Sequence, residues 1–386
     1  MLVVFLFYNI AFIAALLIIR KESPLYATTI LVLMLSFLGH IVGTYYYSLK
    51  PSDSTVLYFP SATSHFYALG GDAVKNMVWY VRYFLTGDSL LATFYFFSSF
   101  AFIGGVLWYT VYLRCAKRLC ILNSSLTWPS LILMCWPSAL VFTTGMGKDS
   151  LCFFFTPLAL LSYFNLLEKR MIVFNIAILV FSLFMLTALR PYLLMVVFIS
   201  FSLYYFKKSR NISLVNILCM IVVLALALFV TQWVLNTQGH FQNIDLTSIV
   251  KRASYQQDMQ AQGTHFEMSF ENPFLRLLFL PYSFFMNLCF PLFYLAKNTE
   301  GYVVSVENAV LVFLLWRSLK LRKLIRQLFL QDPSLKLLLY FFIVGMALMS
   351  FLNTNLGLAV RQKTMYLPAF LVIYCLLYAK TKNTHI

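Results

Sequence analysis

Charged residues are scarce in this chain of 386 residues. They make up 11% of it, whereas a soluble domain carries about 25%. Acidic side chains are the rarest, with 13 Asp and Glu against 29 Lys and Arg. This scarcity excludes a soluble globular domain. Because 61% of the residues are hydrophobic and several apolar runs reach about 18 residues, the sequence predicts an all-α, polytopic transmembrane helix bundle.

Other absences narrow the function. The seven cysteines show no Cys-x-x-Cys or metal-ligand spacing, which argues against a disulfide framework or a zinc site. The chain has no glycine-rich nucleotide loop and no His-Glu-x-x-His pattern, so ATP-driven transport by this chain alone is excluded. We expect no cofactor, and a divalent metal is not supported. The formal charge of +16 is attributed to cytoplasmic loops rather than to nucleic-acid binding.

Basic clusters between the apolar runs predict the topology. We expect one integral membrane domain over residues 1–386, with about eleven spans, the N-terminus outside and the C-terminus in the cytoplasm. The fourth span ends at Thr144 and contains two prolines, and the last runs from Met365 to Tyr378. Two long polar segments, 48–89 and 236–272, are expected at the outer face.

Residues 274–296 are apolar but are interrupted by Arg276, Pro281 and Pro291. A full crossing here would place the next basic cluster outside, against the charge rule. We therefore predict a re-entrant or interfacial segment. Non-helical backbone at membrane depth is tolerated only where protein or a water-filled cavity covers it, so this segment indicates a cavity; a proline-kinked full span is the alternative.

The predicted topology brings unusual charges to the outer face. Lys148 and Asp149 lie between spans four and five, Arg190 between six and seven, and Arg361 between the last two. Guanidinium groups suit phosphate oxygens, and a lysine adds a point charge. Three cations at one outer cavity would suit the diphosphate of a lipid-linked substrate, which needs neutralisation as a leaving group.

A carboxylate could take the proton of an acceptor hydroxyl. The candidates are Asp53, Asp149 and Glu307, the last followed by Asn308 at the expected start of a span. Each has a structural alternative: Asp53 in a turn, Asp149 in an ion pair with Lys148, and Glu307 at a helix N-terminus. The loop histidines His65 and His265 are further candidates for the base, although a solvated loop histidine is the simpler interpretation.

Several short patterns together resemble one family, the O-antigen and exopolysaccharide polymerases, which are membrane-embedded glycosyltransferases of bacteria. The patterns are Pro137-Ser138 followed by Gly147-Lys148-Asp149-Ser150, then Leu189-Arg190-Pro191-Tyr192, Val306-Glu307-Asn308, and Asn355-Leu356-Gly357 followed by Arg361. The resemblance covers the chain from about Pro137 to Pro368 as scattered motifs. The Asp53-Ser54…Tyr58 pattern is looser than that of metal-using membrane glycosyltransferases.

The resemblance implies polymerisation or transfer of polyprenyl-diphosphate-linked glycan at the outer face of the bacterial inner membrane. It adds Asn308 and Asn355 to the expected substrate-binding residues. The expected partners are the lipid-linked oligosaccharide, membrane lipid and polysaccharide chain-length or export proteins, with no nucleic acid. Two alternatives stay open: a flippase or transporter of lipid-linked oligosaccharide, and a non-catalytic scaffold of a polysaccharide synthesis complex.

Overall fold

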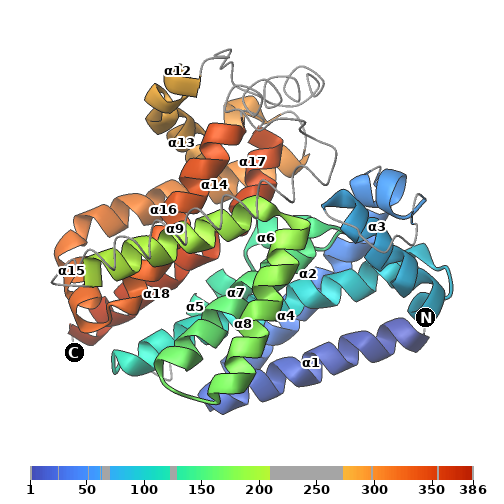
Figure 1. The fold of residues 1–386 in the computed structure, drawn as a ribbon, viewed down its shortest axis with the longest axis horizontal. Coiled ribbons are helices and arrows are strands. Elements are labelled where there is room, and N and C mark those ends of the chain that lie inside the picture. Colours follow the sequence, from blue (N-terminus) through green and yellow to red (C-terminus); the bar gives the residue numbers. More distant parts are fainter. Residues whose placement is uncertain are drawn as a thin grey trace. The chain divides into compact units, whose positions relative to one another are not determined.

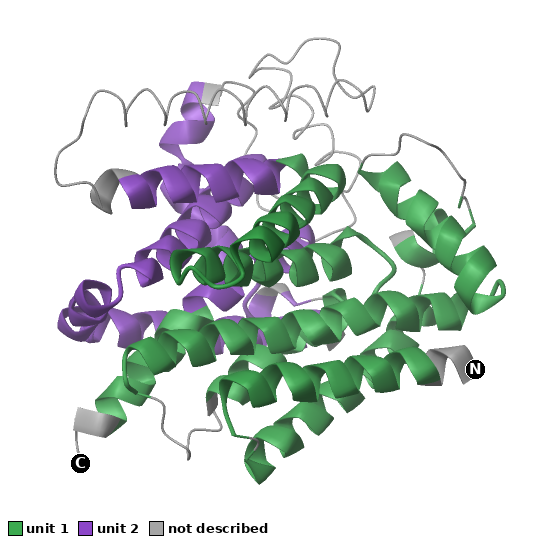
Figure 2. Cartoon of the chain, turned by 60° about the horizontal axis from the view of Figure 1, so that its bottom comes forward, with its two compact units in different colours: residues 1–191, 371–386 green, residues 192–370 purple. Residues whose placement is uncertain are grey.

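The computed structural model describes residues 2–24, 26–50, 52–60, 62, 70–121, 128–208, 273–296, 299–353 and 356–384. Within these ranges every regular element is a helix, which confirms the all-α prediction (Figure 1). The chain divides into two compact units, shown in different colours in Figure 2. The first unit comprises Met1–Pro191 and Leu371–Ile386, and the second comprises Tyr192–Phe370.

The first unit is built around α4 (Leu90–Arg118). This helix packs against α1, α2, α5 and α7, and α7 in turn packs against α8. Close approach depends on small residues, since a Cβ on Gly104 would lie 2.8 Å from the carbonyl oxygen of Phe153 in α7. The other helices of this unit are α1 (Leu2–Glu22), α2 (Ala27–Ser48), η1 (Asp53–Tyr58), α3 (Gly71–Tyr80), η2 (Val81–Thr86), α5 (Trp128–Met134), α6 (Pro137–Phe142), α7 (Lys148–Leu167) and α8 (Ile172–Leu189).

The second unit is organised around the short helix α13 (Leu280–Cys289), which packs against α14, α16 and α17. Helix α18 (Leu367–Thr384) begins in this unit, and its residues from Leu371 onward belong to the first. The remaining described helices are α9 (Pro191–Lys208), α12 (Pro273–Leu278), η3 (Phe293–Leu295), α14 (Thr299–Lys320), α15 (Arg322–Gln331), α16 (Ser334–Leu352) and α17 (Leu356–Lys363).

Among the described helices, six are long and apolar enough to cross a membrane: α2, α4, α7, α8, α14 and α16. The bent pair α17–α18 would make a seventh. Apolar side chains on α8 also face outward, with Val173 84% exposed and Phe184 65% exposed. A helix that is apolar on its exposed face fits lipid rather than water. These helices indicate a membrane protein.

The predicted eleven spans are not confirmed, and the structure gives physical reasons. The fourth predicted span consists of two short helices, α5 and α6, because Pro137 begins a new helix after a break at Cys135 and Trp136. The last is bent by 56° between α17 and α18. The apolar part of α9 is shorter than a full span. The predicted eighth span and the outer segment 236–272 lie outside the described residues.

The two other segments that we predicted to differ from regular spans, 48–89 and 274–296, both contain helices. Segment 48–89, predicted as a long polar segment, forms η1, α3 and η2 in its described part. Segment 274–296 is broken as its prolines suggested: Pro281 lies in the first turn of α13, and Pro291 follows the end of that helix. Its re-entrant path stays a prediction.

Candidate functional site

The stretch from Thr143 to Ser150 joins α6 to α7 and is largely buried. Ser54 of η1 donates a hydrogen bond to the Met146 carbonyl oxygen at 2.9 Å. A Cβ on Gly145 would lie 2.9 Å from the Tyr47 ring, so only glycine fits there without a shift. Helix α2 and η1 therefore fix the path of the chain into the first turn of α7.

That first turn presents Lys148 and Asp149. Arg190, at the end of α8, donates through Nη2 to Asp149 Oδ1 although 41 residues separate the two. Both members of the pair are buried, with Asp149 3% exposed and Arg190 9% exposed. The structure thus brings Asp149 and Arg190 into an ion pair where α7 begins and α8 ends, and the membrane face on which they lie stays a prediction.

Lys148 is partly buried beside this pair, and the charges of Arg190, Asp149 and Asp72 act on it. Asp72 itself pairs with Lys75 at 3.0 Å and is 64% exposed. Two cations, Lys148 and Arg190, therefore lie within electrostatic reach of one buried carboxylate, and only Arg190 forms an ion pair with it. An arrangement with one more cation than carboxylate in a partly desolvated setting suits an anionic ligand.

The ion pair changes the interpretation of Asp149. We predicted it as a base or as a partner of Lys148, but its Oδ1 accepts from Arg190. A carboxylate held in this way orients the guanidinium, so a positioning role is favoured over proton transfer. Asp53 begins η1, next to the Ser54 that contacts the same loop, and its side chain lies outside the described part.

The second unit has its own buried polar cluster. Lys363 is 0% exposed and donates to Asn308 Oδ1 and to the Leu288 carbonyl oxygen, the latter at 3.2 Å. Asn308 Nδ2 donates to the Pro291 carbonyl oxygen at 2.9 Å. Both ends of the Asn308 amide thus bind protein groups, which favours a structural role over the predicted contact with substrate.

One expectation for this unit is corrected. We predicted Glu307 in the first turn of its helix, but α14 begins at Thr299, so Glu307 lies two turns further on, 4% exposed. Its charge acts on the buried Lys363. Arg361, predicted between the last two spans, lies in the last turn of the short helix α17, between α16 and α18 in the chain, and its role stays a prediction. Asn355, His65 and His265 lie outside the described residues.

Sequence reasoning missed Arg276 as a candidate for the site. We treated it only as an interruption of an apolar run, yet its side chain is 0% exposed in α12. Among the described residues none accepts a hydrogen bond from its Nε, Nη1 or Nη2. The signal available beforehand was an arginine alone between Phe274-Leu275 and Leu277-Leu278; a buried charge of that kind requires a partner.

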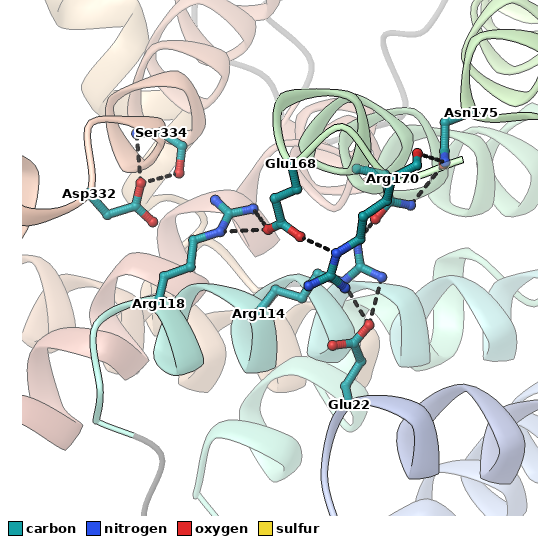
Figure 3. A network of polar contacts seen from close by, with 9 residues as sticks. Glu22, Arg114, Arg118, Glu168, Arg170, Asn175, Asp332 and Ser334 are labelled. Carbon is teal, nitrogen blue, oxygen red and sulfur yellow. Dashed lines mark hydrogen bonds and ion pairs between the residues drawn. The ribbon is translucent and has the colours of Figure 1, made fainter. Parts of the chain in front are cut away.

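A third charged cluster lies at the other end of α7, where Figure 3 shows it. Arg114 of α4 pairs with Glu22 of α1 at 2.6 Å. Arg118 and Arg170 both pair with Glu168, at 2.5 and 2.8 Å. Because each of these arginines has a carboxylate partner, we assign this cluster a structural role, holding the ends of the helices together, and not a role in ligand binding.

The predicted common cavity of Lys148, Arg190 and Arg361 would draw on both units, and it stays a prediction. In the described ranges no three His, Cys, Asp or Glu side chains come together in a way that could hold a metal ion. No protein-family model, no curated protein and no solved structure gives a significant match to this chain.

Proposed function

We propose that this chain polymerises or transfers a glycan carried on polyprenyl diphosphate, at the outer face of a bacterial inner membrane. The observation that carries the proposal is the placement of Lys148 and Arg190 beside a single buried carboxylate, where two apolar, membrane-length helices end. A lipid-linked diphosphate has its tail in the bilayer and its charge at this depth. The short-motif resemblance to polysaccharide polymerases supports the same chemistry.

In the proposed reaction, the bond between the anomeric carbon and the diphosphate oxygen breaks, and its electron pair stays on the diphosphate. Lys148 and Arg190 neutralise that developing charge. The acceptor hydroxyl forms the new glycosidic bond and gives its proton to a carboxylate. Asp149 positions Arg190, which leaves Asp53 as the candidate for the base within the first unit.

The test replaces Lys148, the cation of this site that makes no ion pair in the described structure. In a strain lacking this gene, Lys148→Gln should leave single repeat units in place of polymer on a gel, at an unchanged membrane level of the protein. Loss of one charge-stabilising group typically lowers turnover by about 10²–10³-fold. The matched control is Lys117→Gln, an exposed lysine at the far end of α4, which should give normal polymer.

The outcomes separate the alternatives. Normal polymer with Lys148→Gln overturns the proposed site and favours a scaffold. Accumulation of complete lipid-linked units on the cytoplasmic side, with none outside, favours a flippase. Single units at the outer face, together with lipid-linked substrate that is not consumed, support glycan transfer.

A further inference from the structure

Helices α12 and α13 have two contrasting faces. The side chains of Arg276, Ser283 and Asn287 are all 0% exposed. The large apolar side chains between them point outward, and those that are more than half exposed are Phe274, Leu277, Leu278, Tyr282 and Phe285. A segment that buries its polar groups and exposes its apolar ones is arranged for contact with lipid, the reverse of a helix at a water-facing surface.

Arg276 is the one arginine of the described chain whose side chain is fully buried and whose three guanidinium nitrogens all lack a hydrogen-bond partner there. The carbonyl oxygens of Leu275 and Phe279 accept from the amides of Phe279 and Ser283, each at 3.0 Å, and neither oxygen is a hydrogen-bond partner of the guanidinium. A guanidinium carries five N–H donors and stays charged in proteins. Burying it unpaired is strongly unfavourable, so the site is incomplete without an anion.

We propose that Arg276 binds the phosphate group of a lipid whose tail lies along the exposed apolar face of α12 and α13. The planar fork of a guanidinium matches two phosphate oxygens. The apolar side chains on either side of Arg276 in sequence would contact the tail of the same molecule. The choice of a lipid phosphate over other anions rests on the proposed function, whereas the need for an anion does not. This contact uses the second unit alone.

The binding experiment uses purified full-length protein in detergent, with native mass spectrometry as the readout. Three probes separate the parts of the ligand: polyprenyl diphosphate without sugar, inorganic diphosphate, and uncharged polyprenol. The wild type should retain polyprenyl diphosphate most strongly. Arg276→Met should lose about tenfold of the affinity for the copy that Arg276 holds, because charge-assisted hydrogen bonds are lost, while a copy bound at Lys148 and Arg190 should stay. Arg276→Lys should fall between the wild type and Arg276→Met.

A stability measurement keeps the proposal testable if binding proves weak. Without ligand, Arg276→Met should have the same melting temperature as the wild type or a higher one, because it replaces an unpaired buried charge with an apolar side chain. With polyprenyl diphosphate added, the wild type should gain more in melting temperature than Arg276→Met, in which only the proposed contact with Lys148 and Arg190 remains. The matched control, Arg322→Met, removes an exposed arginine of the same unit and should behave as the wild type in both conditions.

Three results would overturn the proposal. Equal binding of polyprenyl diphosphate by wild type and Arg276→Met is one. Equal retention of inorganic diphosphate and polyprenyl diphosphate would assign Arg276 to a free anion instead. A lower melting temperature of ligand-free Arg276→Met would make the arginine a structural group. Normal polymer with Lys148→Gln, combined with Arg276-dependent lipid binding, would reject the proposed function and leave this inference standing.

Discussion

The two ends of α7 carry charged clusters that differ in how fully they are paired. At the end that follows Leu167, Glu168 accepts from Arg118 and from Arg170, and Glu22 accepts from Arg114. At the beginning, Asp149 accepts from Arg190, while Lys148 makes no ion pair or hydrogen bond in the described structure. We call the end of α7 at Glu168, where every arginine has a carboxylate partner, the closed end. The beginning of α7, where Lys148 makes no ion pair, is the open end.

Exposure separates the two ends only in part. Arg170 is 56% exposed and Glu168 25% exposed, so water can solvate part of the closed cluster. Arg190 and Asp149 are only 10% and 5% exposed at their side chains, so each depends on the other. Arg114 and Glu22, at the paired end, are equally buried at 10% and 5%. The comparison therefore teaches that a spare cation, more than burial, distinguishes a candidate binding site from a cluster that holds helices together.

The largest expected effect comes from removing the buried carboxylate. Asp149→Leu should lower the free energy of unfolding by about 3–5 kcal/mol, because the buried Arg190 loses the carboxylate to which its Nη2 donates. The double variant Asp149→Leu/Arg190→Leu should recover most of that loss without restoring polymer. Equilibrium unfolding in mixed micelles measures both. Glu168→Leu, at the hydrated end, should cost far less; equal losses at the two ends would remove the contrast drawn here.

A smaller effect is expected where the closed cluster is most buried. Glu22→Gln should lower the free energy of unfolding by about 1.5–3 kcal/mol, the value typical of a hydrogen bond to a charged group. Arg114 keeps a hydrogen bond to the Asn165 amide oxygen, so the fold should persist. Polymer length in cells should be unchanged. Shortened polymer at a normal protein level would show that this end also takes part in function.

Close packing of α4 against α7 holds Arg114 and Arg118 of α4 beside the end of α7. Gly104→Ala should cost about 1–3 kcal/mol of unfolding free energy, because the added methyl would meet the Phe153 carbonyl oxygen at 2.8 Å. Gly105→Ala is the matched control, since its Cβ would find its nearest atom, Met134 Cα, at 3.7 Å. That variant should be neutral or slightly stabilising. If the neighbouring glycines respond alike, the packing argument fails.

Sequence patterns predicted some of these features and not others, for identifiable reasons. Hydropathy predicted the helical class, and the charges after apolar runs placed Lys148, Asp149 and Arg190 at one end. The Asp149–Arg190 pair was not predictable, because partners 41 residues apart are selected by the packing of α7 on α8. The eleven predicted spans are not confirmed within the described residues, because hydropathy does not show breaks such as the one between α5 and α6.

Burial was the main quantity that the sequence could not supply. Lys363 looks like a flanking cation of a span, yet it is fully buried against Asn308. Arg276 looks like an interruption, yet it is buried without a partner among the described groups. In both cases the residue type and the hydropathy around it were visible beforehand, but the depth of the side chain depends on the arrangement of α13, α14 and α17.

The smallest effect is expected at an exposed ion pair near the open end. Arg82 of η2 donates through Nε to Asp88, just before α4 begins. This hydrogen bond lowers the pKa of the Asp88 carboxyl and raises that of the Arg82 guanidinium. A carboxyl with a lowered pKa stabilises the fold above its ordinary pKa of about 3.9, and this stabilisation is lost as the pH falls through the lowered value.

Asp88→Asn tests the sign of this pH dependence of stability. Asparagine suits the left-handed backbone of position 88, where φ is 62°, so the change removes the charge and little else. The variant should melt slightly below the wild type at neutral pH, and the two curves should converge as the pH falls below 3.9. A difference that grew on acidification would show that the native fold favours the protonated carboxyl, and the ion pair with Arg82 would then not stabilise the fold.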